Sequence, residues 1–417
     1  MEHRVWLSAV PSFTPCRPCA RLGLRPPSAC FQSVDPSLVC KADYDRARKV
    51  GAVLTKLLRD NLQHRLSRFF QDVTRSRANG GDPVMAVAST TGPHRDDNQD
   101  RVAVAVLRFP QDQRPRMQIA ILCDGMGGLT GGAAAASEAM GAFVSVMALF
   151  EGTLEQGVQQ GVHAANRAVH RRLHGEGGTT LTAVVSTSRE AWCAHVGDSR
   201  LYSYGTDGLR LLTQDDTIHG AIQAHGGGGD EDVLDNRLLQ FVGIGDGLTP
   251  HIQKLHPRDD HLWILTSDGA HGLGRKVLES LLESSRNADD VVRRMIFVAD
   301  ALNVRDNASI AAVRQAEFLD RSEEFGGTTL LISSPFRSLE VWLSETFVGD
   351  DQREPRPGKR DMQPVDETPA TSAVVEDKVE TQGPRRKARA SRSRSKARAS
   401  RPLEVLFESE KADDRPS

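Results

Sequence analysis

The sequence has 417 residues, of which 39% are hydrophobic and 26% are charged, and its formal net charge is −2. This composition is ordinary for a soluble protein with one large domain and extensions, or with two domains. No run of eighteen apolar residues predicts a membrane span, and no continuous apolar stretch near the N-terminus predicts a secretory signal.

Charge is distributed unevenly along the chain. Residues 1–82 are net basic, and residues 385–401 hold nine Lys or Arg residues and no acid. The stretch between these two segments is strongly acidic. An acidic middle between basic ends favours a cation-binding body with separate tails.

Residues 1–41 are expected to form a disordered leader, because they are rich in Pro, Ser, Cys and Arg and have no periodicity. Cys16 and Cys19 could begin a zinc site, but the spacing of Cys30 and Cys40 does not repeat the pair. Unpaired cysteines are therefore the favoured interpretation.

Residues 42–82 are expected to form an amphipathic helix and a linker. Apolar residues recur at helical spacing between positions 50 and 73 and form one stripe, and the segment Asn-Gly-Gly-Asp-Pro at 79–83 then breaks the pattern. The helix must bury its stripe on the main domain or on a partner chain.

Residues 83–314 carry a dense mixture of strand and helix patterns and are predicted to form the main domain. Strands come in neighbouring groups joined by short turns, which favours antiparallel pairing. The predicted strands are 84–89, 102–108, 117–123, 180–187, 191–197, 200–204, 209–213, 251–256, 261–267 and 308–313, and the predicted helices are 131–150, 153–174, 275–285 and 288–303. This order predicts an α+β fold with helices packed outside sheets, not alternating βαβ units.

The remaining segments have weaker patterns. Residues 214–240 lack a clear period and include four consecutive glycines, which predicts a mobile loop with a functional role. Residues 315–348 are predicted to be a short extension with a strand at 328–333 and a short helix at 339–347. Residues 349–417 are predicted to be a disordered tail that contains the basic run 384–401.

Four aspartates occur in a similar context. Asp124, Asp198 and Asp268 follow apolar strand-like runs, and Asp306 precedes one, so each would project a carboxylate from a strand end or an adjoining turn. A single such residue is more often a turn or cap residue. Several carboxylates without His or Cys partners suit Mg²⁺ or Mn²⁺, and a pair of these ions forms a clamp for phosphoryl transfer.

Other candidate ligands are less specific. Arg95 suits a phosphate dianion, although a surface arginine paired with nearby acids has the same pattern. The glycines that begin at Gly125 let the backbone approach an ion and offer a carbonyl ligand. His163, His170 and His174 share a helix face, but a solvated face is favoured over a zinc site because no fourth ligand is in register.

Six short motifs stand in order along the chain. They are Gly92-x-x-Arg95-x-x-Asn98-Gln99-Asp100, Asp124-Gly125-Met126-Gly127-Gly128, Gly178-Thr179-Thr180, Val196-Gly197-Asp198-Ser199-Arg200, Ser267-Asp268-Gly269 and Asp306-Asn307-Ala308-Ser309. The series resembles the protein phosphatase 2C family, the Mg²⁺- or Mn²⁺-dependent serine/threonine phosphatases, in its bacterial type. The resemblance covers residues 84–314.

The resemblance implies a four-layer αββα sandwich of two antiparallel sheets flanked by helix pairs. It also implies that the chain hydrolyses phosphoserine and phosphothreonine in target proteins of a Ser/Thr kinase, through a hydroxide that bridges two Mn²⁺ or Mg²⁺ ions. A third, weaker ion, a cytoplasmic location and a role in signalling are further expectations from the family.

The resemblance assigns roles by matching positions. Asp124 would bridge both ions, and Gly125 would lend its carbonyl oxygen. Asp268 and Asp306 would complete the coordination of one ion.

The other ion would be served by Asp100, with Gln99 acting directly or through water. Asp198 would serve the third ion, and Arg95 would hold the substrate phosphate. Asn307 would support the ligands without binding an ion.

Two departures from the family pattern keep alternatives open. Many relatives have Glu at the position of Gln99, and eukaryotic members have His at the position of Met126, whose thioether cannot protonate a leaving group. A catalytically weak or inactive binding module with the same fold is the alternative to an enzyme, and the enzyme is favoured because Asp124, Asp268 and Asp306 are all in place. A third hypothesis is a nucleic-acid adaptor that works through the basic run 384–401.

Overall fold

The computed structural model describes residues 3–8, 41–73, 75–109, 116–126, 131–224, 235–256, 262–314 and 328–344. These residues belong to the unit Met1–Gln352, and the second unit, Arg353–Ser417, lies outside the described part. The predicted tail, its basic run and the four cysteines before residue 41 therefore also lie outside the described residues.

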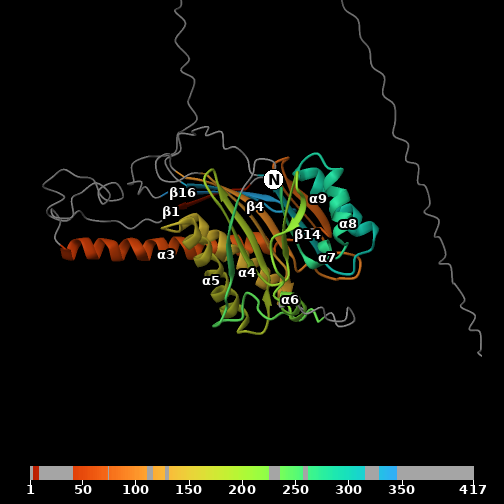
Figure 1. Cartoon of the computed structure of the whole chain (residues 1–417). Helices are drawn as coiled ribbons and strands as arrows, with labels where there is room; N and C mark the ends of the chain where they lie inside the picture. Colours follow the sequence, from red (N-terminus) through yellow and green to blue (C-terminus); the bar gives the residue numbers. More distant parts are fainter. Residues whose placement is uncertain are drawn as a thin grey trace, which may run out of the picture. The chain divides into compact units, whose positions relative to one another are not determined.

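Two β-sheets form the centre of the unit (Figure 1). The first has the order β1 (His3–Ser8), β16 (Ser338–Ser344), β15 (Thr328–Ser333), β4 (Arg101–Arg108), β5 (Met117–Cys123), β8 (Leu181–Thr187), β9 (Ala191–Val196), β12 (His251–Leu255). The second has the order β11 (Gly208–Leu211), β10 (Arg200–Gly205), β13 (Leu262–Thr266), β14 (Ala308–Arg314), β3 (Met85–Thr90), β2 (Arg77–Gly81). Neighbouring strands are antiparallel in both sheets, apart from the parallel pair β1–β16.

Helices cover the outer face of each sheet (Figure 1). The first sheet is covered by α3 (Lys41–Gln71), α4 (Gly132–Leu149) and α5 (Leu154–Leu173), and the second by α8 (Arg275–Glu283) and α9 (Ala288–Ala301). Three smaller elements lie in the connections: the two-stranded pair β6 (Gly125–Met126) and β7 (Gly178–Thr179), the helix α6 (Ile218–Ala224) and the helix α7 (Asp268–His271).

Strand β4 shows how the layers are built. Val102 and Val104 belong to the hydrophobic cluster between the two sheets, whereas Ala103, Ala105 and Leu107 belong to the cluster beneath the helices. Successive side chains of a strand point to opposite faces, so a strand buried on both faces is apolar at every position. The expected α+β sandwich of four layers is confirmed.

Helix α3 carries the apolar stripe that the sequence predicts near the N-terminus. Leu62, Leu66 and Phe69 are buried in the cluster that contains α4, so the second half of the helix packs on the main domain. Val53 and Leu57, which lie earlier in the helix, are 57% and 52% exposed. Only part of the stripe is therefore covered within the described residues.

Helix α4 is the one helix among the described residues that is long and apolar enough to cross a membrane. Of its residues, 78% are buried inside the fold, between α3, α5 and the first sheet. It therefore has the properties of a core helix. Cys123 and Cys193 are buried and free, and burial raises the pKa of both thiols.

Four segments differ from the sequence predictions. Residues 339–347 were expected to be helical, but β16 is a strand in which Leu339, Val341 and Leu343 alternate into the core. Strand β1 lies within the expected disordered leader, and β2 lies within the expected linker. The expected loop 214–240 contains α6 and a β-bridge between Thr217 and Leu238.

These differences have a common physical reason. Strands β1, β2 and β16 are edge or near-edge strands, and the strand propensity of such segments depends on their neighbours in the sheet, so their local patterns are weak. Consequently the two sheets extend beyond residues 83–314, the boundaries expected for the main domain.

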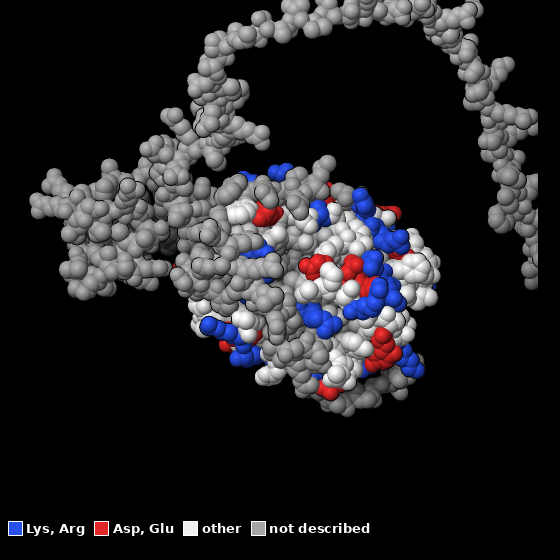
Figure 2. Space-filling view, turned by 90° about the horizontal axis from the view of Figure 1, so that it is seen from above, with Lys and Arg blue, Asp and Glu red and all other residues white. Residues whose placement is uncertain are grey.

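Surface charge is mixed on the face seen in Figure 2, where basic and acidic side chains lie beside one another. On α9, Arg293 pairs with Asp289 and Asp290, and Arg286, which precedes the helix, pairs with Asp290. These arginines are paired with acids of α9, which does not favour binding of nucleic acid at this helix.

Candidate active site

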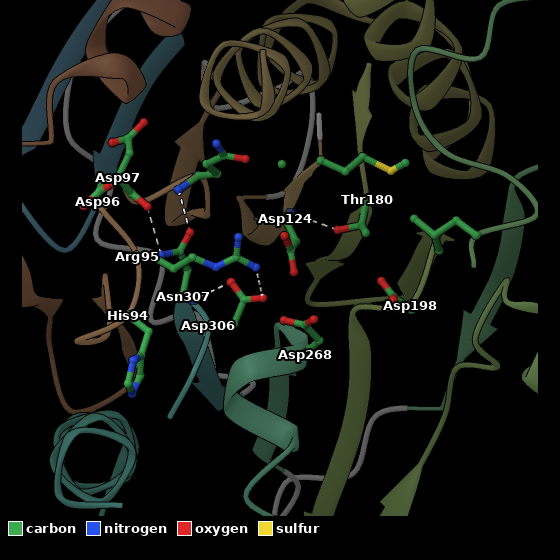
Figure 3. Close-up of a pocket in the computed structure, with 14 residues that line it drawn as sticks. His94, Arg95, Asp96, Asp97, Asp124, Thr180, Asp198, Asp268, Asp306 and Asn307 are labelled. Carbon is green, nitrogen blue, oxygen red and sulfur yellow. Dashed lines mark hydrogen bonds and ion pairs between the residues drawn. The ribbon is translucent and has the colours of Figure 1, made fainter. Parts of the chain in front are cut away.

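A pocket of about 650 Å³ opens where strand ends of both sheets meet (Figure 3). Eight of the nine residues predicted for the site line it: Arg95, Gln99, Asp124, Gly125, Asp198, Asp268, Asp306 and Asn307. The ninth, Asp100, is 2% exposed and lies behind the pocket wall, where its charge acts on Asp124. The residues expected to converge therefore lie together in the fold.

The pairing of β13 with β14 brings two of the aspartates together. Asp268 follows the end of β13, and Asp306 precedes the start of β14. Ser267 donates its backbone N–H to Ser309 O at 3.0 Å, and Ser309 N–H donates to Ser267 Oγ at 2.9 Å. Because antiparallel neighbours run in opposite directions, the end of one strand meets the start of the next.

Asp124 is fixed by the Gly-Thr-Thr motif from the other side of the pocket. Its backbone N–H donates to Thr180 Oγ1 at 2.9 Å. Its carbonyl oxygen accepts from Thr180 N at 2.9 Å and from Thr179 Oγ1 at 2.8 Å. With both backbone groups held, the carboxylate has a defined direction into the pocket (Figure 3).

Asn307 ties the loop that carries Arg95 to the start of β14. Its Nδ2 donates to Thr91 O at 2.8 Å and to Asp97 O at 3.1 Å, and its Oδ1 accepts from Gln99 N at 2.8 Å. All of its amide groups are therefore engaged with the loop backbone. This arrangement makes Asn307 a support for the loop.

Two glycines in the motifs are required by close backbone approach. A Cβ on Gly125 would collide with Gly132 O, and a Cβ on Gly269 would collide with Asn307 O. Any larger residue would push apart the chain segments that carry Asp124 and Asp268.

The aspartates raise one another's pKa values. Burial, followed by the charges of Asp100, Asp268, Asp198 and Asp306, raises the pKa of Asp124 well above its usual value. Burial and the neighbouring acids also raise the pKa of Asp198 to about 7 and that of Asp268. Carboxylates that share a site repel one another, and a bound cation would relieve this repulsion.

Asp100 is the residue that fits a cation most directly. Burial raises its pKa to about 6 although nearby Ser309 and Ser267 lower it, and neither carboxylate oxygen has a hydrogen bond of good geometry. Buried polar atoms are nearly always satisfied, so an unpartnered carboxylate requires an explanation such as an ion. Carboxylate oxygens are the ligands that Mg²⁺ and Mn²⁺ prefer.

Arg95 forms an ion pair with Asp306, and its side chain is 53% exposed. The hydrogen bond to Asp306 raises the pKa of the guanidinium. The sequence left open a pairing with nearby acids, but the partner comes from the far end of the domain. Figure 3 shows the guanidinium directed into the pocket, next to Asp306 and near Asp124.

Among the described residues, no group of three Asp, Glu, His or Cys side chains is arranged as a complete set of metal ligands. This holds for the pocket aspartates and for His163, His170 and His174. In the pocket, Asp306 is engaged by Arg95 and Asp268 Oδ1 accepts from Gly269 N at 2.5 Å. Coordination would require these side chains to rotate.

Six residues of the lining were not predicted as site residues: His94, Asp96, Asp97, Met126, Thr180 and Leu238. Leu238 comes from the expected loop, and the first three lie beside Arg95 within its motif. The adjacency of His94 to Arg95 in the sequence could have indicated that His94 lines the pocket. Figure 3 shows its ring at the rim, directed away from Asp124 and Asp268.

Sequence comparison finds relatives among bacterial phosphatases, although no protein-family model matches. The serine/threonine phosphatase stp of Listeria innocua is 25% identical over 220 residues, which cover 49% of this chain and 87% of the relative. A Streptococcus pyogenes protein described as protein phosphatase 2C-type is 24% identical over 244 residues, which cover 55% of this chain and 96% of the relative.

Solved structures of similar fold include two serine/threonine phosphatases. The Mycobacterium tuberculosis serine/threonine phosphatase PstP/Ppp is 22% identical with a TM-score of 0.48, and the match covers 57% of this chain and all of that one. The catalytic domain of PstP, in complex with two manganese ions, is 23% identical with a TM-score of 0.47 and covers 57% and 97%. On the ordered motifs and the sequence relatives, the chain is similar to bacterial serine/threonine phosphatases of the protein phosphatase 2C type.

Proposed function

We propose that this chain is a metal-dependent protein phosphatase that hydrolyses phosphoserine and phosphothreonine in other proteins. The observation that carries the proposal is the convergence of five aspartates, with raised pKa values for four of them, at a pocket that also contains Arg95. Strongly perturbed carboxylates in a cleft mark functional sites.

The residues would hold two Mn²⁺ or Mg²⁺ ions. Asp124 and the Gly125 carbonyl would serve both ions, Asp268 and Asp306, which line the same pocket, would complete one of them, and Asp100 would serve the other. When bound, the ions supply an activated water and neutralise charge on the phosphoryl oxygens.

A third, weaker ion is proposed at Asp198, which lines the opposite wall of the pocket. Its backbone neighbour Gly197 is held by the segment 214–240, since Gly197 N donates to Asp216 Oδ2 at 2.8 Å. Gln99 and Asn307 would act around the ligands, Asn307 by holding the loop and Gln99 through its amide at the pocket wall.

Arg95 is proposed to bind the substrate phosphate. A guanidinium that pairs with Asp306 can exchange this carboxylate for a phosphate dianion once Asp306 turns to a cation. Binding to phosphate would fix the phosphorus opposite the activated water.

The proton for the leaving alkoxide is proposed to come from solvent water. Met126 lines the pocket at the position where eukaryotic relatives have His, and it carries no acidic proton. His94 is directed away from the aspartates, so it does not replace the missing acid in this arrangement (Figure 3).

The direct test is hydrolysis of para-nitrophenyl phosphate and of a phosphothreonine peptide by the full chain, with Mn²⁺ and with EDTA. We expect turnover with Mn²⁺, none with EDTA, and loss of turnover in Asp268→Ala. Absence of Mn²⁺-dependent turnover in the wild type would favour a binding module with the same fold.

Further proposals concern partners and location. The substrates would be targets of a Ser/Thr kinase, and the enzyme would act in cytoplasmic signalling. The basic run 384–401 would contact an acidic partner or nucleic acid, mainly through phosphates or carboxylates. Salt-sensitive retention on DNA that disappears when residues 384–401 are deleted would support nucleic acid.

A further inference from the structure

Arg101 is a buried arginine directly after the unpartnered Asp100. It is 5% exposed, and burial lowers the pKa of its guanidinium to about 10, so the group stays charged at neutral pH. A buried charge is expensive unless it is hydrogen-bonded, so the contacts of this guanidinium indicate what it is for.

The guanidinium holds the backbone turn that carries Asp100. Its Nη1 donates to Asn98 O and to Asp100 O, both at 2.7 Å. Within the same turn, Asp100 N donates to Asn98 Oδ1 at 3.0 Å. One nitrogen therefore joins both ends of the turn, while neither oxygen of the Asp100 carboxylate accepts a hydrogen bond of good geometry.

The same guanidinium reaches helix α4. Its Nε donates to Ser137 Oγ at 3.0 Å, and Ser137 Oγ donates in turn to Ala133 O at 2.7 Å. Ser137 is fully buried. The turn of Asp100 and the first turns of α4 are therefore joined by a single charged group.

The start of α4 forms part of the pocket wall. Gly132 packs so closely on Gly125 O and on Gln99 Oε1 that a Cβ there would collide with both. Gly125 and Gln99 line the pocket, and Gly125 O is the proposed carbonyl ligand. A shift of α4 would therefore move this carbonyl relative to Asp100.

We propose that Arg101 is a positioning residue, which locks Asp100 and the Gly125 carbonyl into one arrangement for a divalent cation through its bond to Ser137. This inference rests on the proposed function. Outer partners of metal ligands fix the orientation of those ligands, and losing one typically weakens metal binding about 10–100-fold.

Ser137→Ala is the sharpest test, because it removes one hydrogen bond to Arg101 and leaves the charge. Ser145→Ala is a matched control: Ser145 is also fully buried in α4 and also donates to a carbonyl of its own helix, Ala142 O at 2.9 Å. Arg101→Lys is the second variant, because lysine keeps the positive charge but lacks the planar set of N–H donors of a guanidinium.

The measurement is calorimetric titration of Mn²⁺ into the full chain without substrate, together with KM for para-nitrophenyl phosphate at saturating Mn²⁺. We expect Ser137→Ala and Arg101→Lys to weaken Mn²⁺ binding, with Ser145→Ala and the KM of Ser137→Ala unchanged. If Arg101→Lys does not fold, Ser137→Ala alone decides.

The outcomes separate this inference from the proposed function. A wild type that binds Mn²⁺ and a folded Ser137→Ala that binds it equally well would overturn the role of Arg101 only. A wild type that binds no Mn²⁺ would overturn the proposed function and this inference together. Equal weakening in Ser145→Ala would assign the effect to helix packing and would also overturn it.

Discussion

The pocket and helix α9 both contain aspartates near arginines, but the pKa values of Asp124 and Asp290 are shifted in opposite directions. On α9, the hydrogen bond from Arg286 lowers the pKa of Asp290, and Arg293 pairs with Asp289 at 3.0 Å. In the pocket, burial and like charges raise the pKa of Asp124, and the described structure supplies one arginine, Arg95, at the wall. Acids on α9 are satisfied by the chain itself, whereas the pocket acids are arranged for something the chain does not contain.

This contrast teaches where function resides in the fold. A surface ion pair such as that of Arg293 with Asp289 contributes little to stability, because both side chains are partly exposed to water. Convergent buried carboxylates cost stability, and such costs persist at sites where binding or catalysis requires them.

The largest effect is expected from neutralising a pocket acid. Asp268→Asn should lower kcat for para-nitrophenyl phosphate by roughly 100- to 1000-fold, since loss of one stabilising group in a preorganised site has this magnitude. Asp289→Asn on α9 should leave kcat unchanged. Similar activity in the two variants would erase the distinction between the two regions.

A smaller effect is expected from Arg95→Lys. Lysine keeps the charge but loses the bidentate geometry, and one charged hydrogen bond is worth about 1.5–3 kcal/mol. KM should therefore rise roughly tenfold or more, at about 1.4 kcal/mol per tenfold change. The matched change Arg293→Lys on α9 should have no effect, and an unchanged KM in Arg95→Lys would argue against phosphate binding by Arg95.

The smallest effect is a difference in the pH dependence of stability without metal. The raised pKa of Asp198, about 7 against the ordinary 3.8, means that the folded chain binds more protons than the unfolded chain between about pH 4 and 7. Stability contributed by this group is therefore lost as the pH rises through that window. Asp198→Asn should melt at a higher temperature than the wild type at pH 8, and the difference should shrink towards pH 4.

Asp290→Asn should change the melting temperature in the opposite direction. Its pKa in the folded chain is lowered by Arg286, so the pair stabilises the fold above the pKa that Asp290 has in the unfolded chain. This stabilisation is lost as the pH falls through the pKa of the folded chain. This variant should melt at a slightly lower temperature than the wild type at pH 8. Melting curves in EDTA measure both variants, and shifts of the same sign in both would contradict the contrast.

Much of the fold followed from local pattern. The ten predicted strands of the main domain, its four helices and the strand β15 are present within a few residues of their expected bounds. These elements are buried on one or both faces, so their apolar periodicity is strong. Strand β16 was misassigned because a short alternating run is difficult to distinguish from a short helix, and its partner β15 decides the matter.

The site was predictable as a set of residues but not as an arrangement. Asp124, Asp268 and Asp306 could be selected because each stands at the end of an apolar run. Arg95 pairs with Asp306, which is 211 positions away, and Arg101 donates to Ser137 of α4, which is 36 positions away. No local sequence pattern encodes these two contacts. Tertiary packing alone brings these groups together.

The most direct measurement is anomalous X-ray diffraction from crystals of the full chain grown with Mn²⁺. The account predicts two manganese peaks about 3.5–4 Å apart, bridged by Asp124 and flanked by Asp268 and Asp306. Manganese peaks elsewhere on the molecule, or none at this pocket, would contradict it.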